Sequence, residues 1–181
     1  EELIAKALEI VGLRPEEILG KYPHELSGGQ RQRVMIARAF LLKPKLIVAD
    51  EPVSMIDASL RANILNVMLN LKESKGISFL YITHDLSTAR YISDRIIIMY
   101  LGSIMEMGSI EDIIHEPLHP YVKLLIESVP EPNPDKRWKT RIRLPKIELY
   151  EQPILMKGCK FYSRCPLRKE ICLKERPKLI A

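Results

Sequence analysis

A serine, two glycines and a glutamine in succession form the segment of this sequence best suited to hold a phosphate: Ser27, Gly28, Gly29 and Gln30. Apolar residues at helical spacing follow over residues 30–42, and a serine three positions before a glutamine is typical of a capped helix start. Two glycines in a first turn each cost about 1 kcal/mol relative to alanine, which indicates that something approaches the backbone closely. The unpaired N–H groups and positive dipole end of a helix favour a phosphate there. The alternative is a capped helix packed tightly against a neighbouring element.

Two adjacent carboxylates, Asp50 and Glu51, follow an apolar run at residues 45–49 that predicts a fully buried strand. Ligands of open α/β sheets bind at the carboxyl ends of the strands. One carboxylate at such an edge can hold Mg²⁺, mainly through water, while the other orients or activates an attacking water. A second apolar strand, at residues 77–83, ends at His84, so we expect this imidazole at the same edge of the same sheet. The alternative is a pair of solvated acids.

These residues resemble the motifs of the ATP-binding-cassette (ABC) transporter family, in its nucleotide-binding subunit. Residues 26–30 are similar to the signature motif of the family, residues 46–50 to its Walker B strand, and residues 54–57 to its D-loop. Glu51 resembles the catalytic glutamate and His84 the switch histidine. The D-loop departs slightly from the usual pattern, because Met55 and Ile56 stand where alanine and leucine are commoner.

The resemblance implies ATP and Mg²⁺ as cofactors and a head-to-tail arrangement of two cassettes. In that arrangement each ATP lies between the P-loop of one subunit and the signature helix of the other. Asp50 would hold Mg²⁺ of this subunit's own nucleotide, beside the catalytic Glu51 and His84. The residues implied to bind the partner's ATP are Ser27, Gly28, Gly29, Gln30 and Asp57.

A phosphate-cradling G-x-x-x-x-G-K-[ST] motif occurs nowhere in the 181 residues. The strand that precedes this loop and the glutamine loop of the family are also missing. The resemblance therefore implies the carboxyl-terminal part of a longer P-loop NTPase core. We expect the chain by itself to hydrolyse essentially no ATP.

Two further segments resemble the oligopeptide and dipeptide importer group of the family. They are residues 22–25, just before the signature motif, and residues 116–121, which contain His119, Pro120 and Tyr121. From the residues alone, the second segment predicts only a proline-started helix with an exposed histidine. The implied function is that of an ATPase subunit of a peptide importer, or of an importer of related oligomeric solutes. The implied partners are a second cassette, transmembrane permease subunits and an extracytoplasmic solute-binding protein, and the implied location is the cytoplasmic face of the membrane.

The rival function class is a non-transport ABC ATPase that acts on DNA or ribosomes, since such proteins share the same site residues. The His119 segment and the cysteine-containing tail favour transport. The absence of a coiled-coil insertion between the motifs argues against the DNA-repair type.

Charge divides the chain into a nearly neutral body and a basic tail. Residues 1–130 carry a net charge of −3 and residues 131–181 a net charge of +8, so the formal charge of +5 comes from the tail. Seven of the 13 prolines lie in residues 130–177, and residues 130–134 predict an extended linker. We expect α/β architecture with three parts: a helical signature subdomain at residues 1–43, the ATPase core at 44–115, and an irregular, cysteine-containing appendage at 116–181.

The basic segment at residues 136–146 is compatible with nucleic acid or with anionic lipid headgroups. Its only aromatic residue is Trp138, whereas stacking of bases would require more, so we favour a solvated or lipid-facing surface and no nucleic-acid partner. No apolar run approaches the roughly 20 residues needed to cross a bilayer. We therefore expect contact with a membrane only through a partner.

All three cysteines of the chain, Cys159, Cys165 and Cys172, lie in the tail. Such clustering in a cytosolic protein argues for metal or redox chemistry, although zinc and four-iron clusters usually require four ligands. Members of the resembled group that have a similar tail carry a fourth cysteine and can bind a 4Fe–4S cluster. The alternative is three free thiols. Basic neighbours are expected to lower the thiol pKa values: they are Lys157, Lys160, Arg164 and Arg168.

The elements that position these residues follow from periodicity and from turn residues. We expect helices at residues 2–11, 15–19, 30–42, 58–75, 86–92, 110–115 and 121–128. A third strand at residues 95–100, returning through Gly102 to residues 103–106, is expected to close the core. Without the early strands of the family, the strands at 46–49 and 77–82 are expected to keep bare apolar faces.

Overall fold

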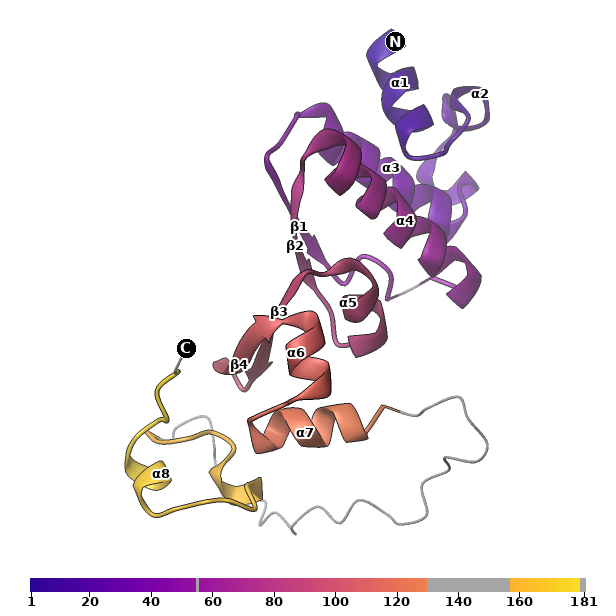
Figure 1. Ribbon diagram of the computed structural model, residues 1–181. Coiled ribbons are helices and arrows are strands. Elements are labelled where there is room, and N and C mark those ends of the chain that lie inside the picture. Colours follow the sequence, from indigo (N-terminus) through magenta and orange to yellow (C-terminus); the bar gives the residue numbers. More distant parts are fainter. Residues whose placement is uncertain (55, 130–156, 180–181) are drawn as a thin grey trace. The chain divides into compact units, whose positions relative to one another are not determined.

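The computed structural model divides into two compact units, Glu1–Ser93 and Asp94–Ala181 (Figure 1). It describes residues 1–54, 56–129 and 157–179. The linker at 130–134 and the basic segment at 136–146 lie outside the described residues. Each unit is taken by itself below, and the division into three functional parts stays a prediction.

The first unit begins with a small helical layer. It comprises α1 (Glu2–Ile10), α2 (Pro15–Ile18), the 3-10 turn η1 (Pro23–Glu25) and α3 (Gly28–Leu41). Apolar side chains on the facing sides of α1, α2 and α3 form its core, with Val11 fully buried at the centre. This layer fixes the position and direction of α3, whose first turn carries the glycines.

A parallel strand pair with a helical crossover completes the first unit. The strands are β1 (Leu46–Asp50) and β2 (Ser78–Ile82), which pair in register from Leu46 with Ser78 to Asp50 with Ile82. Helix α4 (Ala58–Lys75) connects them and ends at Gly76, which has a left-handed φ of 64°. Helix α5 (Leu86–Ile92) follows β2. Because the pair is parallel, Glu51 and the residues that follow Ile82 lie at the same edge.

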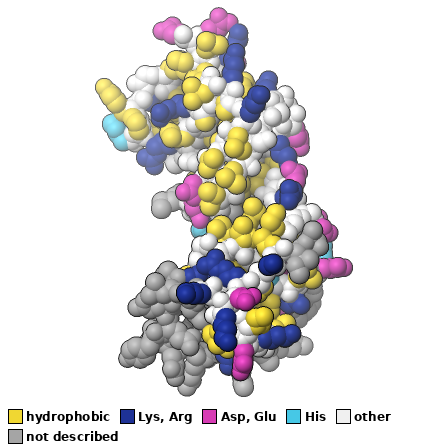
Figure 2. Space-filling model, turned by 90° about the vertical axis from the view of Figure 1, so that its left-hand side faces the viewer, with side chains coloured by type: hydrophobic (Ala, Val, Ile, Leu, Met, Phe, Trp, Pro, Cys, Tyr) yellow, Lys and Arg dark blue, Asp and Glu magenta, His cyan; other side chains and the backbone are white. Residues whose placement is uncertain are grey.

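The prediction of a fully buried first strand is wrong for one of its faces. Exposure alternates along β1 and β2, and four apolar side chains reach the surface: Leu46, Val48, Leu80 and Ile82. Their opposite faces pack against α4 in a core that includes Ile64, Leu65 and Met68. Period-two exposure is what a sheet covered on one side shows, and the predicted bare apolar face is confirmed. Figure 2 shows hydrophobic side chains reaching the surface over much of the face it presents.

The second unit is built on an antiparallel hairpin of β3 (Arg95–Tyr100) and β4 (Ser103–Ser109). Leu101 and Gly102, with φ of 48° and 73°, form its two-residue turn, as such hairpin turns require. Helices α6 (Ile110–His115) and α7 (Pro120–Glu127) follow. The 3-10 turn η4 (Tyr162–Arg164) and helix α8 (Ile171–Lys174) lie in the tail.

The two strands of the hairpin pair with each other, and their predicted closing of the core stays a prediction. In the described residues β3 and β4 form a sheet of their own. Its core consists of Ile98, Ile113 and Val122, so α6 and α7 cover the hairpin instead of a longer sheet. The predicted helices agree with those of the structure to within about two residues at each end. None of the described helices combines the length and the apolar character that a bilayer crossing requires.

Candidate functional site: an ATPase edge and a signature helix

The first turn of α3 has the predicted capping box. The Ser27 hydroxyl accepts a hydrogen bond from the Gln30 backbone N–H at 3.2 Å, and the Gln30 side-chain oxygen accepts one from the Ser27 N–H at 2.9 Å. This reciprocal pair fixes the start of the helix, and Ser27 and Gly28 are exposed there. The exposed end of α3 thus has the geometry that an anion-binding helix start requires.

The two glycines differ in what surrounds them. A Cβ added at Gly28 would meet nothing within 4 Å, whereas one added at Gly29 would lie 3.3 Å from Cδ1 of Leu60 on α4. Gly29 is therefore explained by tight packing of helix on helix, which is the alternative interpretation of this motif. Packing does not explain the glycine at position 28. Because the space beside Gly28 is open, a ligand can approach the backbone there.

Alanine at Gly28 is predicted to stabilise the protein and to impair its function. Helix propensity gives Gly28→Ala up to about 1 kcal/mol of added unfolding free energy. If a nucleotide approaches this backbone, the same methyl group weakens ATP-dependent association of the full gene product by about 10-fold, or 1.4 kcal/mol. Chemical denaturation and sedimentation measure the two effects. Gly29→Ala is the matched control: it must displace Leu60, so its gain in stability should be smaller. Association unchanged in Gly28→Ala would contradict a nucleotide-facing role.

Glu51 lies at the carboxyl end of β1 in an unusual backbone conformation. Its φ is 48°, in the left-handed region that non-glycine residues seldom adopt. Such a conformation costs on the order of 1–3 kcal/mol and is found preferentially at functional sites. The Glu51 N–H still donates to the Ile82 carbonyl at 2.9 Å, and the Ser54 hydroxyl donates to the Glu51 carbonyl at 3.0 Å. These bonds hold the backbone so that the Glu51 side chain turns away from the path of the strand.

The prediction that His84 lies at the same edge of the sheet as Asp50 and Glu51 is confirmed. Nδ1 of His84 lies 2.7 Å from Oε1 of Glu51, although the residues are 33 positions apart. The Glu51 side chain is 37% exposed and that of His84 is 77% exposed, so water reaches both. Asp50 is exposed at the same strand end. The arrangement can orient a water molecule and supply a hard carboxylate oxygen, of the kind that Mg²⁺ prefers.

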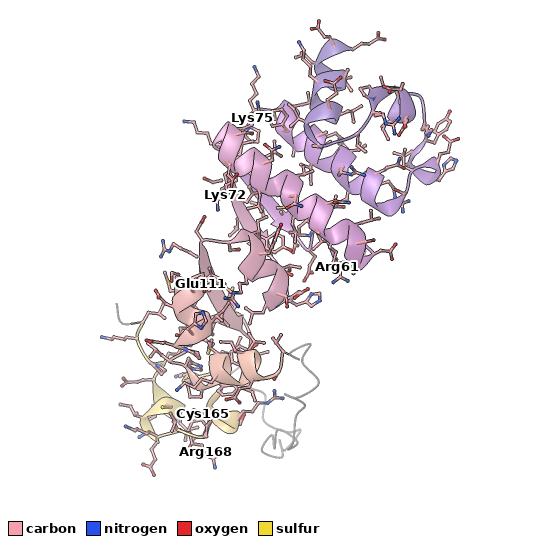
Figure 3. The ribbon with its side chains drawn as sticks, turned by 45° about the vertical axis from the view of Figure 1, so that its right-hand side comes forward. Arg61, Lys72, Lys75, Glu111, Cys165 and Arg168 are labelled. Carbon is pink, nitrogen blue, oxygen red and sulfur yellow. The ribbon has the colours of Figure 1, made fainter. Side chains whose placement is uncertain are left out.

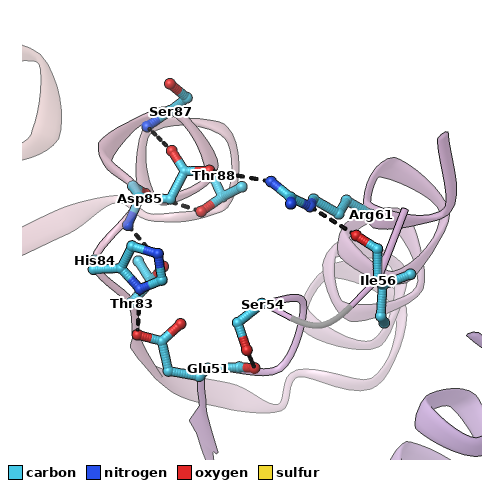
Figure 4. A network of polar contacts seen from close by, with 9 residues as sticks. All are labelled: Glu51, Ser54, Ile56, Arg61, Thr83, His84, Asp85, Ser87 and Thr88. Atoms are coloured by element: carbon cyan, nitrogen blue, oxygen red, sulfur yellow. Dashed lines mark hydrogen bonds and ion pairs between the residues drawn. The ribbon is translucent and has the colours of Figure 1, made fainter. Parts of the chain in front are cut away.

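The segment after β2 is held by its own hydrogen bonds (Figure 4). Asp85 accepts a bond from the Ser87 N–H at 2.9 Å, which caps α5, and its own N–H donates to the Thr83 hydroxyl at 3.0 Å. Arg61 on α4 donates from Nε to the Ile56 carbonyl at 3.0 Å, and its Nη1 lies 3.8 Å from a carboxylate oxygen of Asp85. Sequence reasoning did not single out Arg61 or Asp85. Two sequence signals were available: Asp85 directly precedes the helix predicted at residues 86–92, and Arg61 lies in the first turn of the helix predicted at residues 58–75.

Asp57 is exposed at the start of α4, and its side chain makes no capping bond there. Its backbone carbonyl accepts from the N–H groups of Leu60 and Arg61. The predicted site residues of the first unit thus lie at three places: the sheet edge (Asp50, Glu51 and His84), the start of α3 (Ser27, Gly28, Gly29 and Gln30) and the start of α4 (Asp57).

In the second unit, His119 is half-buried, so the prediction of an exposed histidine is wrong. Its Nδ1 accepts a hydrogen bond from the Tyr121 N–H at 3.1 Å and caps α7. The buried Glu106 carboxylate accepts bonds from the N–H groups of Leu118 and His119, at 3.0 and 2.8 Å. The chain thereby encloses the histidine between a buried acid and a helix start, which sequence spacing did not indicate. Burial lowers the pKa of His119, and Glu106 opposes that shift.

The capping role of His119 predicts a measurable loss of stability in acid. Because its folded-state pKa lies below the ordinary 6.5, the unfolded chain binds the proton more readily, so the stabilisation is present above pH 6.5 and is lost as the pH falls below it. Protonated Nδ1 can no longer accept the Tyr121 bond, and a lost cap costs about 1 kcal/mol. His119→Asn retains a capping oxygen without titrating there. We expect the unfolding midpoint of the wild type to drop more between pH 7.5 and 5.5 than that of the variant; equal drops would contradict this role.

Phe161 anchors the tail within the second unit. It is 1% exposed, and its ring centroid lies 5.3 Å from that of Tyr121, 5.5 Å from that of Tyr100 and 5.8 Å from that of His119. Aromatic clusters of this geometry add to the free energy of simple burial. The segment after the linker is therefore packed onto the helix that His119 begins.

The three cysteines lie in the same tail segment as Phe161. The Cys159 N–H donates to the Cys172 carbonyl at 2.8 Å, and all three thiols are free. Within residues 1–54, 56–129 and 157–179, no group of three histidine, cysteine or acidic side chains is arranged to hold a metal ion. Burial is the main cause that raises the pKa of Cys165; Arg168, near it in Figure 3, lowers it by less. The expectation that basic neighbours lower the thiol pKa is thus wrong for Cys165, because desolvation outweighs them.

Two segments of the chain match known protein families. Residues 1–54 match the ABC transporter family, and residues 105–172 match the family described as oligopeptide/dipeptide transporter, C-terminal region. The oligopeptide transport ATP-binding protein OppF of Salmonella typhimurium is 45% identical over 169 residues, which are 93% of this chain and 50% of that protein. The putative oligopeptide transport ATP-binding protein YkfD of Bacillus subtilis is 46% identical over 177 residues, 98% of this chain and 54% of that protein.

Solved structures show the same fold. An ATP-binding cassette of an ABC transporter in its ADP conformation aligns with a TM-score of 0.59 and 34% identity, over 68% of this chain and 50% of that chain. An inward-facing putative metal-chelate type ABC transporter aligns with a TM-score of 0.61 and 25% identity, over 71% and 49%.

The fold and the site define part of the nucleotide-binding cassette of an ABC transporter. Within that class, the chain belongs to the family of oligopeptide and dipeptide transporter ATP-binding proteins. It spans about half the length of the curated relatives it matches.

Proposed function

We propose that this chain supplies the hydrolytic edge and the signature helix of an ATPase subunit that powers a peptide importer. The observation that carries the proposal is the contact between Glu51 and His84 at the end of a parallel strand pair. The names of the relatives and the match of residues 105–172 to the oligopeptide/dipeptide group support peptides, or related oligomeric solutes, as the cargo.

The residues fit ATP and Mg²⁺ on two observations. Asp50 presents an exposed carboxylate at the strand end, which suits a magnesium ion held mainly through water. The open space at Gly28 leaves the backbone N–H groups of α3 accessible to a phosphate. Bound Mg²⁺ would supply charge neutralisation to the phosphates. Glu51 would orient or activate the attacking water, and the imidazole of His84 would hold the Glu51 carboxylate in place.

The residues divide between two nucleotides in the head-to-tail arrangement that the family resemblance implies. Asp50, Glu51 and His84 act on the ATP of this subunit. The other group, Ser27, Gly28, Gly29, Gln30 and Asp57, acts on the ATP of a second cassette. Permease subunits and an extracytoplasmic solute-binding protein complete the proposed assembly at the cytoplasmic face of the membrane.

The cysteine tail enters this proposal only as a structural element. Within the part of the chain that the structure describes, the three thiols are not arranged to hold a metal ion, and by themselves they do not supply the four thiolates that a 4Fe–4S cluster usually takes.

The test is reconstitution of the full gene product with its second cassette and permease subunits in liposomes. We expect ATP-dependent uptake of a labelled peptide, together with ATP hydrolysis that responds to the peptide-loaded binding protein. A rate of ATP hydrolysis that does not change with the permease subunits or the binding protein, but rises when DNA or ribosomes are added, would contradict the proposal and favour the non-transport class. The relatives named above and the family matches do not support that alternative.

A further inference from the structure

Arg61 closes a ring of contacts around the hydrolytic edge (Figure 4). From Glu51 the chain runs to Ile56, whose carbonyl accepts a bond from Arg61 at 3.0 Å. Arg61 faces Asp85 at 3.8 Å, and Asp85 directly follows His84, which returns to Glu51 at 2.7 Å. The ring therefore joins the two loops that carry the proposed catalytic side chains.

Packing alone does not fix the positions of the two catalytic side chains. The His84 side chain is 77% exposed, and Glu51 stands on a left-handed backbone that is sustained only by its surroundings. Exposed side chains retain rotamer freedom, so their relative position has to be set by the backbones that carry them. The loop after Glu51 and the segment around Asp85 are those backbones.

The segment around Asp85 is already rigid on its own side. Its backbone N–H donates to Thr83, its side chain accepts from Ser87, and its carbonyl accepts from the Thr88 hydroxyl at 2.9 Å. Among the described contacts, the Arg61 side chain connects the loop that ends at Ile56 to this segment. Core packing of Val53 and Ile56 also holds this loop, and the guanidinium of Arg61 adds the polar tie that connects it to Asp85.

The chemistry of arginine suits this position. A guanidinium presents several N–H donors in a fixed plane, so Nε can bond the Ile56 carbonyl while Nη1 faces the Asp85 carboxylate; an ammonium group has no such fixed geometry. Arg61 also lies in the first turn of α4, where its own N–H donates to the Asp57 carbonyl at 3.0 Å. The donor plane is thus anchored on a rigid helix.

We propose that Arg61 is a positioning residue of the ATP site, which sets the distance between Glu51 and His84 by tying the loop after Glu51 to Asp85. The inference rests on the proposed ATPase function. Arg61 touches neither nucleotide nor water in this role and acts through the two loops. Because half-exposed ion pairs contribute little to stability, its removal should affect turnover more than folding.

The test is steady-state ATP hydrolysis by the full gene product with its second cassette. Arg61→Gln is expected to lower kcat about 10-fold while the KM for ATP stays within about two-fold, because misplacement of reacting groups slows chemistry without weakening binding. Arg61→Lys should recover part of the loss. Lys75→Gln, which removes a positive charge at the other end of α4, is the matched control and should equal the wild type (Figure 3).

A double-mutant cycle separates positioning from a general loss of structure. Asp85→Asn keeps a capping oxygen for α5 but removes the charge that faces Arg61. If both act through one contact, the double variant should lose little more activity than Arg61→Gln alone. Fully additive losses, an unchanged kcat in Arg61→Gln, or a loss explained by a lowered unfolding midpoint would overturn the inference while the wild type remains active. An inactive wild type would overturn the proposed function itself.

Discussion

Glu51→Gln is expected to reduce ATP hydrolysis by the assembled full-length protein by about 10²–10⁴-fold, the usual contribution of a general base. The amide keeps the size of the side chain and an oxygen for His84, whose Nδ1 lies 2.7 Å from the carboxylate. It removes the negative charge that orients and activates water. Because the signature residues and Asp50 are untouched, nucleotide binding should persist. Phosphate release and fluorescent nucleotide binding measure the two properties.

Glu73→Gln is the matched control for that experiment. Glu73 is exposed on α4, away from β1 in the chain, so the same loss of charge should leave hydrolysis unchanged. If both variants hydrolyse ATP at the wild-type rate, Glu51 does not activate water, and its contact with His84 has only a structural role.

Phe161→Ala is expected to cost about 3–5 kcal/mol of unfolding free energy in the second unit, the usual range for a buried phenylalanine. The ring is 1% exposed and contacts Tyr100, His119 and Tyr121. Its loss removes the anchor that packs the tail onto α7. Hydrogen exchange at the amides of Val122 and Ile98, in the core of this unit, should therefore accelerate together with exchange in the tail.

The neighbouring Leu167 provides the control. Its side chain is 68% exposed, so Leu167→Ala should change stability by no more than about 0.5 kcal/mol. A cost below about 1 kcal/mol for Phe161→Ala would show that the aromatic cluster does not hold the tail. The position of the cysteine-containing tail in this unit would then not depend on Phe161.

Local sequence signals were sufficient to predict most elements. The serine and glutamine of the capping box placed the start of α3, Gly76 marked the end of α4, and the turn at Gly102 gave the hairpin. The same-edge position of Glu51 and His84 also followed from sequence, because two apolar runs with a helical crossover dictate a parallel pair.

Features that depend on tertiary packing could not be predicted in this way. The runs in β1 and β2 are apolar on both faces, but only one face is covered in the described structure. The periodicity of apolar residues in a sequence does not show whether another element covers a given face of a sheet. The partial burial of His119 depends on Glu106, thirteen residues earlier in the chain, and on Phe161 in the tail.

The same limit applies to the thiols and to Arg61. A count of basic residues near Cys165 omits desolvation, which decides the direction of its pKa shift. Arg61 carries no motif, and its partners come from a loop and from the segment after β2. Only the folded chain brings these groups together.

The proposed function requires ATP to join two cassettes through the signature helix of this chain. The most direct test is sedimentation of full-length Glu51→Gln protein, mixed with its second cassette, with and without ATP and Mg²⁺. We predict a two-cassette species that forms only with nucleotide and that Gly28→Ala weakens. Absence of nucleotide-dependent association, with both proteins folded, would contradict the proposed division of this chain's residues between two ATP molecules.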